Sequence, residues 1–249
     1  MLPILILQTG GPPQAVGDVY GGFDRMVSEV AGLDPAGLVR VAAYKGERPQ
    51  APTRYRAALI TGSRANVTDH APWSEACAGW VRDAMDASLP LFGICYGHQL
   101  ISYALGGRID YLEGGREIGT RPVELTSAAR EDPLLAGMPA MFAAHFIREQ
   151  AVLEPPRGAV ALAVNDRDPH QMLRYGPNAV SVQFHPEFTA PIMRAYFDVM
   201  RSGLDAEGID VQALRAGVAE TPASHAILRR FFESTGTIPG AGKASAAAA

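Results

Sequence analysis

The sequence predicts an α/β protein built on a mostly parallel sheet, and three features of the chain point to it. Short, almost continuous apolar runs, typical of strands buried on both faces, alternate with helical patterns through the first half. The second half carries short strand patterns separated by Gly, Pro, Asn and Asp, which predict additional antiparallel or mixed strands on the same sheet. A length of 249 residues, 47% of them hydrophobic, suffices for one such domain with a sizeable core.

The elements can be placed along the chain from these patterns. Between the third and fourth strands, segment 73–88 has apolar residues near helical spacing, and Ser74 is expected to cap this helix with Glu75 in its first turn. From Ala190 onward the pattern is helical again. We expect one domain over residues 1–235 and a low-complexity, disordered tail over residues 236–249. The first-half strands are expected at 3–8, 38–44, 57–61 and 89–95, and the second-half strands at 108–113, 120–126, 140–146, 159–165, 171–176 and 178–184.

Composition excludes several classes of function. The net charge of −4, without a block of Lys or Arg, argues against a nucleic-acid partner or an anionic membrane surface. Cys77 and Cys95 are the two cysteines, which make neither a disulfide framework nor zinc-ligand spacing, and the histidines form no metal-binding pattern. The apolar N-terminal run MLPILILQTGG predicts a strand rather than a signal peptide, and no run is long enough for a membrane helix. We therefore expect a cytoplasmic protein.

The stretch LPLFGICYGHQLISYALGG places a thiol at a chemically informative junction. Cys95 ends an apolar strand and a helical pattern starts directly after it, with Gly93 and Gly97 flanking the turn. A side chain on so sharp a strand-to-helix turn needs small neighbours, and the same arrangement with serine is the nucleophile elbow. The start of a helix favours a negative charge on the thiol, and the Tyr96 amide is placed to stabilise an oxyanion. The alternative is that Cys95 is a small buried hydrophobe, which is how we interpret the mid-helix Cys77.

A thiol nucleophile requires a base, and His185 is the best candidate. It follows the apolar strand in NAVSVQFHPEF, where Pro186 prevents the strand from continuing regularly. Glu187 can reach the far ring nitrogen of His185 if the chain turns at the proline, as an orienting carboxylate does in a catalytic triad. A purely structural histidine at the end of a strand is the alternative.

Together, GICYGHQ and the downstream VQFHPEF resemble the class I glutamine amidotransferases, a family with a Cys-His-Glu triad. The resemblance extends from the first strand to about residue 190 and is strongest to stand-alone proteins similar to the glutaminase domain of GMP synthase. It implies a flavodoxin-like three-layer α/β sandwich. It also implies that Cys95 is the nucleophile, His185 the general base and Glu187 its orienting partner.

The same resemblance implies further site residues. The backbone amides of Ser63 and Tyr96 would form the oxyanion hole, although Thr61-Gly62-Ser63-Arg64 stands where familiar members have a Ser-Gly-Gly-Pro-like loop. Phe146 and Ile147 likewise replace the Gly-Asp or Ser that follow the histidine of the substrate-binding loop. Substrate contacts are expected from Gly62, Gln99, His145 and Phe146.

The implied activity is hydrolysis of the glutamine side-chain amide through a cysteine thioester, with neither a metal nor an organic cofactor. The ammonia would pass to a separate synthetase or acceptor subunit, because no G-x-x-x-x-G-K-[ST] phosphate-binding loop is present. One alternative is a stand-alone γ-glutamyl hydrolase or peptidase acting on γ-glutamyl conjugates. Another is a catalytically silent regulatory protein, against which the intact Cys95, His185 and Glu187 argue. The oligomeric state, the acceptor and the pathway stay open.

Overall fold

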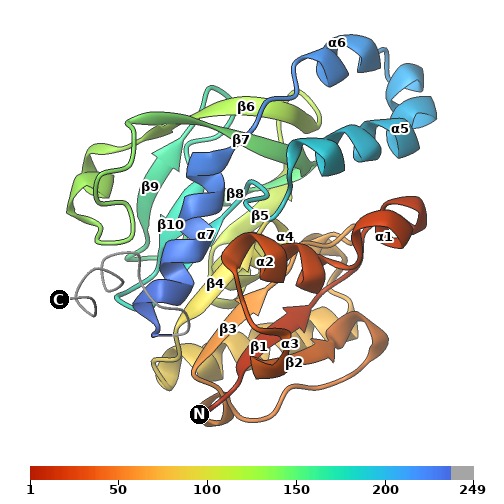
Figure 1. Ribbon diagram of the computed structural model, residues 1–249. Coiled ribbons are helices and arrows are strands. Elements are labelled where there is room, and N and C mark those ends of the chain that lie inside the picture. The colour runs from red at the N-terminus through yellow and green to blue at the C-terminus, as the bar shows by residue number, and fades with distance from the viewer. Residues whose placement is uncertain (237–249) are drawn as a thin grey trace, which may run out of the picture.

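A nine-stranded sheet forms the centre of the protein, with helices on both faces, in a computed structural model that describes residues 1–236 (Figure 1). The sheet order is β2-β1-β3-β4-β11-β10-β9-β6-β7, and β5 pairs separately with β8. The strands are β1 Ile4–Gln8, β2 Leu38–Ala42, β3 Ala57–Ile60, β4 Leu91–Ile94, β5 Arg108–Tyr111, β6 Glu117–Leu125, β7 Met141–Arg148, β8 Gln150–Glu154, β9 Val160–Val164, β10 Met172–Arg174 and β11 Ala179–Val182. The α-helices are α1 Gln14–Tyr20, α2 Phe23–Ala31, α3 Pro72–Asp86, α4 Tyr96–Ala104, α5 Ala190–Ala206, α6 Val211–Ala216 and α7 Pro222–Ser234.

The parallel half of the sheet consists of β2, β1, β3, β4 and β11, and the remaining strands pair antiparallel. This order of five parallel strands is the flavodoxin order, in which ligands bind beyond the carboxyl ends of the strands. The predicted three-layer α/β class, with a parallel core and added antiparallel strands, is confirmed.

The last strand, β11, is one of the mixed strands that the sequence allows: it lies parallel to β4, with Ser181 opposite Gly93, and antiparallel to β10. Two other expectations about the strands were wrong. The strand at 108–113 is not on the main sheet, because β5 pairs only with β8 among the described strands. The segment of β8 was not predicted as a strand at all. The first error concerns which strands pair, and pairing depends on contacts between segments far apart in the sequence.

Strand β1 shows how the two cores are separated by the sheet. Ile4 and Ile6 face a cluster that includes residues of α2 and α7, while Leu5 and Leu7 face a cluster that includes residues of α3 and α4. Because successive side chains of a strand point to opposite faces, a continuous apolar run is what a two-sided core requires. The helix layers in Figure 1 lie on the two faces accordingly.

Helix α3 begins earlier than the sequence indicates. Its N-cap is Ala71 with Pro72 in the first turn, so Ser74 is not the cap. The Ser74 hydroxyl is buried and lies 2.6 Å from the Tyr96 hydroxyl, which ties α3 to the start of α4. Proline is well suited to the first turn of a helix because an N–H at that position would have no acceptor within the helix.

A third apolar cluster sits beside the carboxyl ends of the parallel strands. It joins α1, α5 and α6 through Val16, Phe197 and Val211, and it includes Phe188 before α5. Helix α5 thereby lies next to the strand ends where a ligand is expected (Figure 1).

The C-terminal expectation lies mostly outside the described residues. Helix α7 ends at Ser234, and the tail is predicted over residues 236–249. Of this tail only residue 236 is among the described residues. Among residues 1–236, we find no helix with the length and apolar character needed to cross a membrane.

Candidate active site

Cys95 occupies a strained turn between β4 and α4. Its backbone has φ 50° and ψ −98°, an unfavourable conformation for a residue with a side chain. The flanking glycines make the turn possible: a Cβ at Gly93 would lie 2.7 Å from the Gly97 carbonyl carbon, and one at Gly97 would collide with the Ile60 carbonyl oxygen. Strand and helix therefore touch backbone to backbone. Strain of this kind is found preferentially at functional sites.

His185 and Glu187 form a buried pair at the end of β11. The His185 Nδ1 lies 2.9 Å from the Glu187 Oε1, and both side chains are at most 5% exposed. The chain turns at Pro186 as the sequence predicts, and the backbone N–H of His185 donates to the His145 carbonyl at 2.9 Å. With Nδ1 directed at the carboxylate, Nε2 is left to face the site.

The charges around His185 oppose the effect of its burial. Burial alone would lower the pKa of this imidazole, but the Glu187 carboxylate and the neighbouring Cys95 together raise the pKa to about 10. The ring can therefore take up and hold a proton. A thiol beside such an imidazole has a proton acceptor within reach.

Gly62 packs between the nucleophile candidate and the histidine. A Cβ at Gly62 would lie 3.1 Å from the His185 Cε1 and 3.7 Å from the Cys95 Cβ. Residues Gly62, Cys95, His185 and Glu187, which stand at the ends of β3, β4 and β11, are here called the floor of the site.

The loop after β3 carries the second amide expected in an oxyanion hole. The Thr9 hydroxyl lies 2.8 Å from the Thr61 carbonyl oxygen and 3.0 Å from that of Gly62, so β1 holds this loop in place. The Ser63 amide makes no hydrogen bond to another described residue, and the Tyr96 amide, first in its helix, has no intrahelical acceptor. Both amides are thus free to bind an anionic oxygen.

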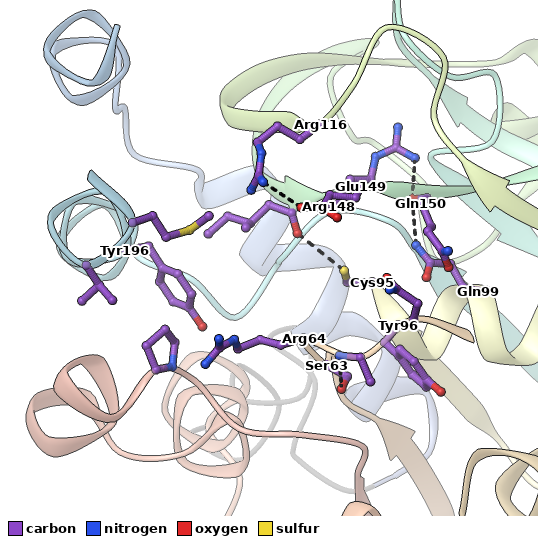
Figure 2. A pocket seen from close by; sticks show the side chains of 16 residues that line it. Ser63, Arg64, Cys95, Tyr96, Gln99, Arg116, Arg148, Glu149, Gln150 and Tyr196 are labelled. Carbon is purple, nitrogen blue, oxygen red and sulfur yellow. Dashed lines mark hydrogen bonds and ion pairs between the residues drawn. The ribbon is translucent and has the colours of Figure 1, made fainter. Parts of the chain in front are cut away.

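A pocket of about 400 Å³ opens above Cys95 (Figure 2). The Cys95 Sγ lies at its base, 3.9 Å from the Ile147 carbonyl oxygen. Its lining comes from the N-cap of α1, the loop after β3, the start of α4, the residue before β6, the end of β7 with the start of β8, and α5. The lining residues are Pro13, Ser63, Arg64, Ala65, Asn66, Cys95, Tyr96, Gln99, Arg116, Ile147, Arg148, Glu149, Gln150, Tyr196, Val199 and Met200.

Of the four residues expected to contact substrate, two lie at the pocket and two have buried side chains away from it. Gln99 lines the pocket, and its amide donates to the Gln150 carbonyl at 2.8 Å, while Gly62 belongs to the floor. The side chains of His145 and Phe146 are fully buried and are not among the lining residues. His145 instead lies 3.1 Å from the Thr120 hydroxyl, and burial lowers its pKa to about 4, helped by the charges of His225 and His185.

The pocket-facing part of the β7–β8 segment lies just beyond these two residues. Phe146 packs edge-to-face on Phe184, with 6.1 Å between ring centroids, whereas Ile147 faces the pocket. Alternation along β7 explains the difference, because neighbouring side chains of a strand point to opposite sides.

Sequence reasoning missed the charged and aromatic residues of the pocket sides: Arg64, Arg116, Glu149 and Tyr196, here called the walls. Arg116 pairs with Glu149 at 2.7 Å and with Glu207 at 2.7 Å, so it links the β7–β8 segment to the end of α5. Arg64 was noted only as a departure from a loop pattern. The other three lie in segments with no motif, and no local signal in the sequence could have identified them.

No cluster of three or more His, Cys, Asp or Glu side chains able to hold a metal ion occurs within residues 1–236. The reactive groups at the site are the thiol, the imidazole, the carboxylate and the free amides. This donor set suits nucleophilic attack on an amide carbonyl with a histidine for proton transfer.

Comparisons with known proteins identify relatives of this chain. The sequence model of the family described as "Glutamine amidotransferase class-I" matches residues 38–197. "Gamma-glutamyl peptidase 5" of Arabidopsis thaliana is 26% identical over 183 residues, covering 72% of this chain and 73% of that protein. A GMP synthase (glutamine-hydrolyzing) of Thermomicrobium roseum is 31% identical over 129 residues, covering 52% of this chain but only 23% of the synthase.

Solved structures show the same fold. The crystal structure of a glutamine amidotransferase from Thermotoga maritima superposes with a TM-score of 0.76, over 94% of this chain and 98% of the other, at 20% sequence identity. A glutamine amido transferase from Methylobacillus flagellatus superposes with a TM-score of 0.73, over 94% and 95%, at 19% identity.

Proposed function

The chain belongs to the class I glutamine amidotransferase family, and we propose that it hydrolyses the γ-amide bond of glutamine or of a γ-glutamyl conjugate through a thioester on Cys95. The observation that carries the proposal is the buried His185–Glu187 pair beside a thiol held at positive φ. Packing alone has no use for a strained cysteine next to a buried, charge-stabilised imidazole.

The proposed reaction follows from the floor residues. His185 holds the proton given up by the Cys95 thiol, and the sulfur attacks the γ-carbonyl carbon of the substrate. The amides of Tyr96 and Ser63 bind the resulting oxyanion, each worth about 3 kcal/mol of transition-state stabilisation in comparable sites. His185 then gives the proton to the departing amine and subsequently activates the water that hydrolyses the γ-glutamyl thioester to glutamate.

The walls supply groups suited to the amino-acid end of the substrate. Glu149 and Arg116 lie side by side at 2.7 Å, so one wall presents both a carboxylate and a guanidinium. An α-amino-acid group carries the complementary pair of charges. Gln99, fixed by its bond to the Gln150 carbonyl, also lines the pocket and lies to the right of Cys95 in Figure 2.

Two leaving groups are compatible with this chemistry. Ammonia from glutamine would be passed to a separate acceptor enzyme, as the similarity to GMP synthase suggests. A larger amine would leave from a γ-glutamyl conjugate, and the match over about three quarters of the Arabidopsis peptidase supports that case. The bond that breaks is the same in both.

The test is a hydrolysis assay with glutamine and with γ-glutamyl-alaninamide, followed by trapping with 6-diazo-5-oxo-norleucine and intact-protein mass measurement. We expect turnover of at least one substrate, one covalent adduct, and loss of both with Cys95→Ala. Cys77→Ala is the matched control, because burial in α3 raises the pKa of that thiol to about 11 and leaves it unreactive. A folded protein that cleaves neither substrate, or a Cys95→Ala variant that still does, would refute the proposal.

A further inference from the structure

We propose that Arg64 and Tyr196 form a subsite for a carboxylate carried by the leaving amine. This inference rests on the proposed function and narrows its substrate class to γ-glutamyl amino acids and γ-glutamyl peptides, whose leaving amine bears a carboxylate. Nothing in the catalytic floor requires either residue.

The two residues lie on the histidine side of Cys95. The His185 ring stacks on Phe188 at 4.2 Å and 13°, and Phe188 stacks on Tyr196 at 4.9 Å and 28°. Arg64 belongs to the same loop as Gly62, which packs directly against the His185 ring. Because the imidazole must protonate the departing amine, the leaving group has to occupy this side of the thiol.

Both polar groups are available to a ligand. Arg64 is exposed, lines the pocket, and makes neither an ion pair nor a hydrogen bond with any residue from 1 to 236. Tyr196 is only 5% exposed, yet its hydroxyl has no hydrogen-bond partner in the same part of the chain. The hydroxyl oxygen itself is not among the buried atoms that lack a partner, so this end of the side chain is open to the pocket and to a ligand there.

Figure 2 shows the two side chains converging. The Arg64 side chain runs below Cys95 toward the Tyr196 hydroxyl. Burial raises the pKa of Tyr196, as do the charges of Glu187 and Cys95, so the phenol stays a hydrogen-bond donor. A guanidinium and a phenol O–H directed at one space are donors that match a carboxylate.

The charged wall residues differ between the two sides of the pocket, so each side suits a different carboxylate of the substrate. Glu149 is the one acidic side chain among the lining residues, and it pairs with Arg116 on the wall away from Tyr196. That wall suits the zwitterionic α-amino-acid end. On the Arg64 side the lining residues include a guanidinium and no acidic side chain, which suits an anion without an accompanying ammonium group.

The experiment compares γ-glutamyl-alanine with γ-glutamyl-alaninamide, two substrates of nearly the same shape that differ in the leaving-group carboxylate. We expect kcat/KM to be about tenfold or more higher for the acid, the scale of one charge-assisted hydrogen bond. Arg64→Gln should bring the ratio of the two values close to one, and Arg64→Lys should keep part of it. Tyr196→Phe should lower the ratio by a smaller factor.

Arg54→Gln is the matched control. Arg54 is an exposed arginine just before β3, at the amino ends of the parallel strands and so at the opposite edge of the sheet. We expect this variant to keep the wild-type ratio. In parallel, binding of both compounds to Cys95→Ala, measured by calorimetry, should show the same preference without turnover and lose it with added Arg64→Gln.

Each remaining outcome decides against the inference. Equal kcat/KM for the acid and the amide in the wild type would overturn it while leaving the proposed function intact. An Arg64→Gln variant that loses activity equally on both substrates would mean that Arg64 binds the α-carboxylate of the γ-glutamyl group. Cleavage of neither these compounds nor glutamine would refute the proposed function, and the subsite with it.

Discussion

The floor and the walls of the pocket are built in opposite ways. The floor residues are buried and closely packed: a Cβ at Gly62 would lie 3.1 Å from the His185 ring, and one at Gly97, in the turn that carries Cys95, would collide with the Ile60 carbonyl. The walls carry exposed or half-exposed charges, and their ion pairs join segments far apart in the sequence, as Arg116 joins Glu149 and Glu207. A rigid floor keeps reacting groups in place, while walls made of side chains can change without disturbing it. We infer that the floor sets the reaction and the walls set the substrate.

The largest expected effect tests the rigidity of the floor. Gly97→Ala would place a methyl group against the Ile60 carbonyl and should lower the free energy of unfolding by about 3 kcal/mol. Gly79→Ala is the control, because its Cβ would meet only the Arg82 side chain at 3.8 Å in the interior of α3. That variant should gain up to about 1 kcal/mol from helix propensity. Urea unfolding of both variants is the measurement, and equal effects would remove the distinction between the floor and an ordinary helix.

The next effect separates the charges of the floor from those of the walls. Glu187→Gln removes the carboxylate that raises the pKa of His185, so burial will dominate and the pKa will fall. We expect kcat/KM to drop by about a hundredfold and the alkaline limb of its pH profile to move to lower pH. Glu149→Gln on the wall should change KM and leave that limb where it is. A shift of the limb with Glu149→Gln and none with Glu187→Gln would reverse our assignment.

The His185–Glu187 pair also predicts how the free energy of unfolding depends on pH. The native pKa of His185, about 10, lies above its ordinary 6.5, so this imidazole stays protonated in the folded protein between those values. The resulting stabilisation is complete below pH 6.5 and is lost as the pH rises toward 10. Urea unfolding across this window should show a steeper decline for the wild type than for Glu187→Gln. Parallel declines would mean that other groups dominate the titration.

The smallest expected effect concerns Thr9, which supports the loop after β3 that carries the Ser63 amide. Thr9→Val keeps the shape of the side chain but removes the hydroxyl that contacts the Thr61 and Gly62 carbonyls. We expect kcat to fall about tenfold with little change in KM, because a displaced Ser63 amide weakens binding of the transition state. Thr9→Ser should restore activity. A change in KM alone would place the effect in the substrate-binding walls.

The sequence by itself determined the parts of this protein that depend on local pattern. Continuous apolar runs predicted the parallel strands, because strands covered on both faces leave no polar side. The glycines around Cys95 and the proline after His185 predicted two sharp turns, since both residue types act on their own backbone. These local features, read with the family resemblance, led to the confirmed fold and family and to the floor residues, whose roles remain predictions.

The tertiary structure alone decided which distant segments meet. It set β11 beside β4, and thereby brought His185 next to Cys95. It turned His145 and Phe146 inward while Ile147 faces the pocket, and it added Arg64, Arg116, Glu149 and Tyr196 as walls. Strand pairing and wall formation depend on packing between elements separated by tens to more than a hundred residues. Such contacts follow from the free energy of the whole fold, which no local pattern encodes.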